Sequence, residues 1–160
     1  MKKNLIIKYI AKKLIQQRPD LKEARRVFGK EGYLELVRGS VISELSPEFR
    51  NEIETILRKR FNLKPHTCVF CNEPTVEQWV ADITGLFSEE DIYTVFSQNS
   101  GLPPEKIRIS KYGDNIMDKN AIEEIVKLLE VSTGRKLEHI GYLRGDDDYT
   151  YKDIAKFFAV

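Results

Sequence analysis

The sequence predicts an all-α protein built from two tandem helical bundles. Apolar residues recur at three- and four-residue spacing in several segments, which places them on one face of a helix. No segment shows the sustained alternation of apolar and polar residues that a half-buried strand requires. A similar order of parts occurs twice along the 160 residues, so we expect one bundle over residues 1–83 and a second over residues 84–160.

The first half is expected to open with an amphipathic helix over about residues 3–17, because Pro19 disfavours helical geometry in the residue before it. Its predicted apolar stripe consists of Leu5, Ile6, Tyr9, Ile10, Leu14 and Ile15. Residues 21–41 mix three glycines with apolar pairs, which predicts a short helix followed by a connecting segment.

The sequence Ser46-Pro47-Glu48 is typical of a helix start. Ser46 can accept backbone N–H bonds as the N-cap, and Pro47 suits the first helical position, where its missing N–H costs no hydrogen bond. We expect this helix to continue to about Arg60. A shorter helix is expected over residues 77–83, with Trp79 in the core rather than in a ligand site.

The second half shows three helix patterns. Ser88 is expected to cap a helix that ends near Gly101, and a longer amphipathic helix should run over residues 119–132 and stop at Gly134. A final short helix is expected over residues 151–158. The side chains predicted to be buried in the last two helices are Ile122, Ile125, Val126, Leu128, Leu129, Ile154, Phe157 and Phe158.

Composition and charge exclude several classes of protein. No apolar run approaches the roughly 20 residues needed to cross a bilayer, and the start lacks a signal-peptide core, so we expect a cytoplasmic protein without membrane association. Residues 1–64 contain 16 Lys/Arg against 8 Asp/Glu, whereas residues 65–160 contain 10 against 17. The first bundle is therefore basic and the second acidic. This asymmetry is consistent with solvated helix surfaces, with attraction between the two bundles, or with partners of opposite charge.

Segments in both halves resemble acyl carrier proteins. Residues 61–65 (Phe-Asn-Leu-Lys-Pro) resemble the F-G-I-x-I-P end of that family's second helix, and residues 75–83 resemble its T-V-x-D-V-x-x-Y-I helix. In the second half, residues 101–107 (Gly-Leu-Pro-Pro-Glu-Lys-Ile) resemble the G-V-x-x-E-x-V/I segment that ends the first helix. The resemblance covers most of residues 84–160 and about half of 1–83, and it implies two tandem carrier-like four-helix bundles.

The resemblance also implies a site for the phosphopantetheine arm. In the family, a serine at the start of the second helix accepts 4′-phosphopantetheine. Alignment of the two long helices places Pro47 at that position in the first half and Lys119, after Asp118, in the second. Ser46 lies one residue away, and a one-residue shift rotates a helical side chain by about 100°. We therefore expect Ser46 to cap its helix, with attachment of phosphopantetheine at Ser46 as the alternative.

Carrier proteins present an acidic second helix to basic partner enzymes. The corresponding helix of the first half is basic and carries Arg50, Arg58, Lys59 and Arg60. The helix of the second half keeps an acidic face. The residues expected to face an unidentified protein partner are Lys119, Glu123, Glu124 and Glu130.

The segment His66-Thr67-Cys68-Val69-Phe70-Cys71 holds the two cysteines of the chain in a CxxC spacing. We expect Cys68, together with Phe70 or Cys71, to pack inward, because a buried free cysteine behaves as a small apolar residue. The alternatives are a zinc site built on His66, Cys68 and Cys71, with Glu73 or Asp82 as a further ligand, and thiol redox chemistry. Zinc needs four ligands, and the sequence offers few other donors.

The expected function is that of a non-catalytic, carrier-like protein-interaction module without a phosphopantetheine arm. The sequence contains no Gly-rich phosphate loop, no Ser/His/Asp constellation and no HExxH motif, so we do not expect an enzyme. The alternatives are a divergent carrier modified at Ser46 and a nucleic-acid-binding protein that uses the basic first half. The interleaved Glu residues and the acidic second half disfavour nucleic acid as the partner.

Overall fold

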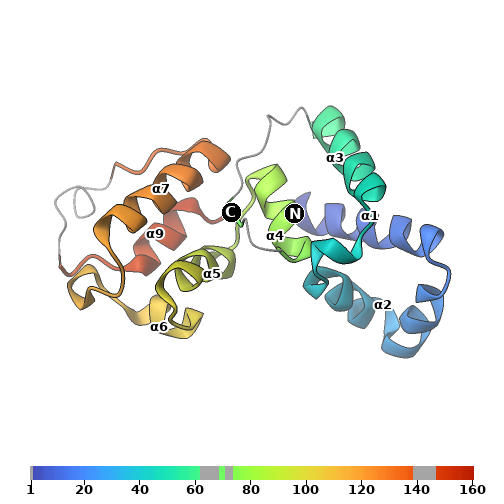
Figure 1. Cartoon of the computed structure of the whole chain (residues 1–160), viewed down its shortest axis with the longest axis horizontal. Helices are drawn as coiled ribbons and strands as arrows, with labels where there is room; N and C mark the ends of the chain where they lie inside the picture. The colour runs from blue at the N-terminus through green and yellow to red at the C-terminus, as the bar shows by residue number, and fades with distance from the viewer. Residues whose placement is uncertain (1, 62–68, 71–73, 139–146) are drawn as a thin grey trace. The chain divides into compact units, whose positions relative to one another are not determined.

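The computed structural model describes residues 2–61, 69–70, 74–138 and 147–160 (Figure 1). Within these ranges the chain is helical, with two isolated β-bridges and no strand, which confirms the all-α fold class. Contacts divide it into two compact units. Unit 1 comprises the described residues up to Thr84 except Val69, and unit 2 comprises Val69 and the described residues from Gly85 onward.

Unit 1 contains four helices and one turn of 3₁₀-helix. They are α1 (Lys2–Gln17), α2 (Leu21–Gly39), η1 (Ile42–Glu44), α3 (Pro47–Phe61) and α4 (Val76–Thr84). Helix α1 packs against α2 and α4, and α2 also packs against α4. The core of the unit includes Ile7, Ile10, Phe49, Ile53, Leu57, Val76, Trp79 and Val80. Trp79 therefore lies in the core as predicted, with 6% of its surface exposed.

Helix α2 corrects the expectation of a short helix and a connecting segment. It extends to Gly39 and bends at Gly29, whose φ of 75° and ψ of 173° lie outside the helical region. Glycine adopts this positive φ without the Cβ clash that other residues suffer. The helix resumes after the bend because Tyr33, Leu34 and Val37 are buried, and this burial outweighs the low helix propensity of the glycines.

The apolar stripe of α1 also differs from the prediction at two positions, Leu5, which is exposed, and Ile7, which is buried and was not predicted. Leu5 is 64% exposed, whereas Ile6, Ile7, Ile10 and Leu14 are buried. Residues 6, 10 and 14 are four apart and share a helix face with residue 7, and Leu5 lies beside that face.

Two backbone hydrogen bonds join the segment before α3 to the start of α4. The Ile42 N–H donates to the Pro74 carbonyl at 2.9 Å, and the Val76 N–H donates to the Ser40 carbonyl at 2.9 Å. The Ser40 hydroxyl also donates to the Leu36 carbonyl in the last turn of α2, at 2.7 Å. These bonds tie the segment after α2 to the start of α4.

Unit 2 contains four described helices and a second 3₁₀ turn. They are α5 (Glu89–Ser100), α6 (Pro104–Ile109), η2 (Tyr112–Asp114), α7 (Lys119–Thr133) and α9 (Tyr151–Phe158). The ends of α5 and α7 follow the sequence signals. Ser88 and Asp91 form a reciprocal capping box at the start of α5, and Gly101 and Gly134 adopt left-handed conformations at the C-terminal ends.

Helix α6 was missed by the sequence reasoning, which took Leu102-Pro103-Pro104 only as the end of the preceding helix. Pro104 instead occupies the first turn of α6, where proline costs no hydrogen bond. Ile107 on this helix is fully buried and contributes to the core of unit 2.

The core of unit 2 centres on Tyr151, which is fully buried. Its ring meets the ring of Phe96 edge-on at a centroid distance of 5.1 Å and that of Tyr112 at 5.5 Å. Leu128 and Phe157, predicted to be buried, are only partly covered. Both lie at the margin of their helix's apolar face.

Backbone bonds also join the segment before α7 to the start of α9. The Tyr112 N–H donates to the Tyr149 carbonyl at 2.9 Å, and the Tyr151 N–H donates to the Ser110 carbonyl at 3.4 Å. The Ser110 hydroxyl donates to the Lys106 carbonyl in the last turn of α6 at 2.5 Å.

No described helix has the length and apolar character required to cross a membrane.

Candidate functional site

The start of α3 holds Ser46, the residue expected to cap this helix and, in the alternative, to carry the phosphopantetheine arm. Ser46 is exposed, its Oγ accepts the Phe49 N–H at 3.1 Å, and its carbonyl accepts the Arg50 N–H at 3.0 Å. Pro47 follows as the first helical residue, and Phe49 is buried beneath this turn. The hydroxyl of Ser46 therefore caps the helix, as the sequence predicts, while solvent still reaches the side chain.

The start of α7 is built in the same way from different residues. Asp118 is the N-cap, and its Oδ1 accepts the Asn120 N–H at 3.4 Å. Lys119 is the first helical residue and is exposed. Lys119 therefore stands at the same place in α7 as Pro47 does in α3, the first residue of the helix.

The predicted partner surface of α7 contains residues in two different situations. Glu123 and Glu124 are exposed, as is Lys119. Glu130 is partly buried, and its Oε2 accepts the Leu137 N–H at 2.8 Å. Glu130 thus holds the segment that follows α7 in place, a role that no sequence pattern indicated.

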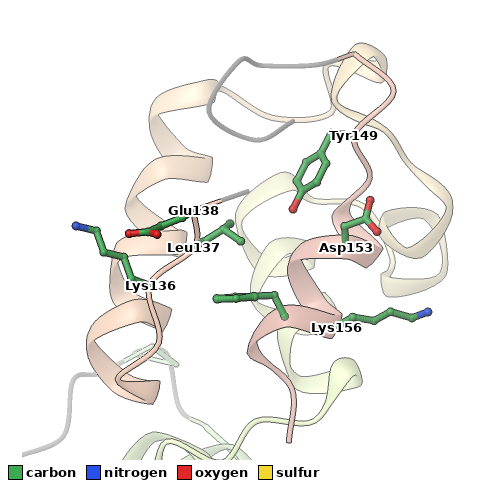
Figure 2. A pocket seen from close by; sticks show the side chains of 7 residues that line it. Lys136, Leu137, Glu138, Tyr149, Asp153 and Lys156 are labelled. Atoms are coloured by element: carbon green, nitrogen blue, oxygen red, sulfur yellow. The ribbon is translucent and has the colours of Figure 1, made fainter. Parts of the chain in front are cut away.

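A pocket of about 560 Å³ lies in unit 2 between this segment and α9 (Figure 2). Its lining residues are Lys136, Leu137, Glu138, Tyr149, Asp153, Lys156 and Phe157. Figure 2 shows Leu137 and Glu138 on one side, Asp153 and Lys156 on α9 on the other, and the Tyr149 hydroxyl pointing into the space between them. The volume lies within the range of pockets that bind small molecules.

Structural contacts hold the two walls of this pocket. The Arg135 Nη1 donates to the Phe157 carbonyl at 2.9 Å, which ties the segment after α7 to the end of α9. The Asp153 carboxylate accepts the Thr150 hydroxyl at 2.9 Å, and the Thr150 Oγ1 accepts the Asp153 N–H at 3.3 Å. Asp153 is therefore part of a helix cap as well as part of the lining.

Charged and apolar residues line the pocket, and Figure 2 shows the side chains of Lys136 and Lys156 pointing away from the space between its walls. Its lining offers two lysines, two carboxylates and one phenol, beside the largely buried Leu137. No lining residue is a cysteine, histidine or serine. Sequence reasoning missed this pocket, because its walls come from separate segments whose approach depends on Arg135 and Glu130.

The possible metal ligands His66, Cys68 and Cys71 lie outside the described residues, as does Glu73. Asp82, the other candidate ligand, is buried, and its carboxylate accepts the Phe70 N–H at 3.1 Å. Elsewhere in the described ranges, no three His, Cys, Asp or Glu side chains gather in a way that could hold a metal ion.

Comparison of the chain with protein-family models, with curated proteins and with solved structures gave no match.

The cap at Ser46 yields a prediction about stability. Ser46→Ala should lower the free energy of unfolding of unit 1 by about 1 kcal/mol, because the Phe49 N–H loses its acceptor. Urea unfolding followed by the fluorescence of Trp79, the single tryptophan, measures this. Ser46→Asp keeps a capping oxygen and should change the value little; equal losses in both variants would contradict the capping role.

Proposed function

We propose that the chain is a non-catalytic protein-interaction module made of two tandem units that resemble acyl carrier proteins, and that neither unit carries a phosphopantetheine arm. The observation that supports this most strongly is the correspondence between the hydrogen bonds of the two units. It complements the resemblance found in the sequence.

The correspondence extends over the segments that surround α3 in unit 1 and α7 in unit 2. Ser40 and Ser110 each end a helix by donating a hydroxyl to the carbonyl four residues earlier. Each serine carbonyl then accepts the N–H of the first residue of the last helix in its unit, Val76 or Tyr151. In both units a 3₁₀ turn comes next, η1 before α3 and η2 before α7.

The last helix of each unit also begins in the same way. The hydroxyl oxygens of Thr75 and Thr150 each accept the backbone N–H of the residue three positions later, and each threonine N–H donates to the side-chain oxygen of that residue. Each threonine also forms a β-bridge, Thr75 with Val41 and Thr150 with Lys111. Two separate segments with this many equivalent bonds are expected of a repeat.

The proposal that neither unit carries an arm rests on the residues that follow the two helix caps. Pro47 has no side-chain oxygen, and the amine of Lys119 cannot form the phosphate ester that a serine hydroxyl forms. Ser46 is exposed, and the nearby backbone N–H groups of the first turn suit a phosphate, so its surroundings could accommodate the arm. Its register, one residue before the family's position, favours capping.

The surface charges of α3 and α7 favour a basic partner for unit 2. Exposed Glu123 and Glu124 give α7 a negative face. On α3, Arg58 pairs with Glu54 on the same helix at 3.8 Å, while Lys59 and Arg60 are exposed. Complementary charge steers association and discriminates between partners, so a basic surface should select α7 over α3.

Intact mass after co-expression with a broad-specificity phosphopantetheinyl transferase tests the absence of the arm. We expect no mass gain in the wild-type chain, with a known carrier protein modified in the same cells as the positive control. A gain of one phosphopantetheine that disappears in Ser46→Ala would overturn this and identify a divergent carrier.

Photo-crosslinking tests the interaction surface. A photoreactive residue at position 123 or 124 should give an adduct of one mass in extracts of the source cells, and reversal of the neighbouring glutamate to lysine should remove it. The matched control is the exposed Lys152 on α9, at which the same probe should give no such adduct. Equal capture from both helices would contradict a partner site on α7.

A further inference from the structure

A second cavity lies in unit 1, between α1 and α2. Its volume is about 460 Å³, a size typical of sites for small molecules. Its apolar lining comes from Ala11 and Ile15 on α1 and from Tyr33 and Leu34 on α2, all of them buried or partly buried. We refer to this cavity as the α1–α2 cleft.

A buried hydrogen bond joins the two walls of the α1–α2 cleft. The Tyr33 hydroxyl donates to the Ala11 carbonyl at 3.1 Å, and both residues are almost fully covered. The bend at Gly29 lets residues from both halves of α2, Arg25 before it and Lys30 after it, line the cleft. The cleft is therefore part of the folded unit and does not need a ligand to form.

The polar lining of the cleft is strongly basic. Lys8 and Lys12 on α1 and Arg25 and Lys30 on α2 contribute four positive charges, and Glu31 contributes the single negative charge. All five side chains are exposed at the rim. Lys8 and Lys12 are one helical turn apart, a spacing at which like charges destabilise a helix.

Cations next to the cleft form ion pairs with carboxylates of the described residues, whereas those that line it do not. Lys13 pairs with Glu52 at 3.7 Å, Arg18 with Asp20 at 3.2 Å, and Arg26 with Glu23 at 2.5 Å. Within the described part of the chain, no carboxylate forms an ion pair with Lys8, Lys12, Arg25 or Lys30. The positive charge at the cleft is thus left available to a ligand.

Of the cations that line the cleft, Arg25 acts on the Tyr33 hydroxyl at its floor. Burial raises the pKa of Tyr33, and the charges of Arg25 and Arg18 act in the opposite direction. An anion in the cleft would lie above an apolar floor, where its attraction to the lysines is screened less than at an open surface.

We propose that the α1–α2 cleft binds an anionic amphiphile, that is, a small molecule in which a phosphate or carboxylate adjoins an apolar group. The anionic group lies among Lys8, Lys12, Arg25 and Lys30, and the apolar group covers Ala11, Ile15 and Leu34. The cleft belongs to unit 1, whereas α7 and its pocket belong to unit 2, so the proposal does not depend on the carrier-like function.

The probe is hexyl phosphate, titrated into the full-length chain and followed by NMR of the Ala, Ile and Leu methyl groups. Saturable shifts centred on Ala11, Ile15 and Leu34 are expected. Inorganic phosphate and 1-hexanol, which each supply one half of the probe, should bind at least tenfold more weakly. No binding of hexyl phosphate, or shifts centred elsewhere, would overturn the proposal.

A matched pair of double variants separates the cleft from general basicity. K12Q/R25Q removes two cations of the cleft, and K13Q/R26Q removes their sequence neighbours with the same change in net charge. The first should weaken binding of hexyl phosphate at least tenfold and the second less than twofold. Far-UV circular dichroism checks that both remain folded, and equal weakening would contradict the assigned site.

Vesicles distinguish a free ligand from a lipid headgroup. Phosphatidylcholine vesicles with and without phosphatidic acid are tested by co-sedimentation. If hexyl phosphate binds and K12Q/R25Q, but not K13Q/R26Q, lowers binding to phosphatidic acid vesicles, the same site takes a lipid headgroup. If hexyl phosphate binds and the vesicles do not, the ligand is a free amphiphile. Binding to vesicles alone would refute the cleft as a site for a single molecule.

Discussion

Gly85→Ala should lower the free energy of unfolding of unit 2 by more than about 3 kcal/mol. A Cβ at this position would overlap the backbone carbonyl oxygen of Ser132 in the last turn of α7. Its φ of 69° adds the strain of a left-handed conformation in a residue with a side chain. Because the obstructing atom belongs to a helix backbone, relief requires movement of α7 itself.

Two other glycines separate the overlap from the backbone strain. Gly101 and Gly134 have φ values of 75° and 74°, and a Cβ at either position meets no atom within 4 Å. Alanine at these positions should cost only the left-handed penalty of about 1 kcal/mol. Urea unfolding followed by far-UV circular dichroism compares the three variants; a loss in Gly85→Ala no larger than in the controls would show that residue 85 does not approach α7.

Helix ends were predictable in this chain where a short-range hydrogen bond determines them. Ser88 with Asp91 begins α5, Gly134 ends α7, and Ser46 begins α3, and each signal acts over at most four residues. The bounds of α9 also agree with the prediction, because Thr150 caps it and its apolar residues lie on one face. Local chemistry was sufficient for these elements.

Elements determined by tertiary contacts were not predictable. The glycines of α2 weaken a helix locally, and only the burial of Tyr33, Leu34 and Val37 shows why the helix continues. Pro104 is compatible with a helix end and with a helix start, and the burial of Ile107 selects the second. A single sequence does not reveal which alternative is buried.

The same division applies to the candidate sites. The cap at Ser46 and the exposed face of α7 follow from local pattern. The pocket of unit 2 instead depends on two hydrogen bonds, that of Glu130 with Leu137, seven residues later, and that of Arg135 with Phe157 at the end of α9, 22 residues later. The α1–α2 cleft likewise depends on the contact between Tyr33 and Ala11.

Alkaline pH should destabilise unit 2 through Tyr151. Burial, with a smaller contribution from the negative charge of Asp114, raises the pKa of Tyr151 to about 12, against about 10 in the unfolded chain. A group with a raised folded-state pKa contributes fully below the unfolded pKa, and its contribution falls as the pH rises from 10 to 12. The expected loss by pH 11.5 is about 2 kcal/mol.

Comparison of the wild-type chain with Tyr151→Phe isolates this contribution. Phenylalanine keeps the ring that packs against Phe96 and Tyr112 and removes the ionisable hydroxyl. Urea unfolding at pH 8 and at pH 11.5 should show a smaller loss of stability in the variant, by about 2 kcal/mol. Burial also raises the pKa values of Tyr33 and Tyr93, so the variant should retain part of the alkaline loss. Parallel pH profiles for the two proteins would mean that Tyr151 ionises as readily in the folded chain as in the unfolded one, which is incompatible with its place in the core.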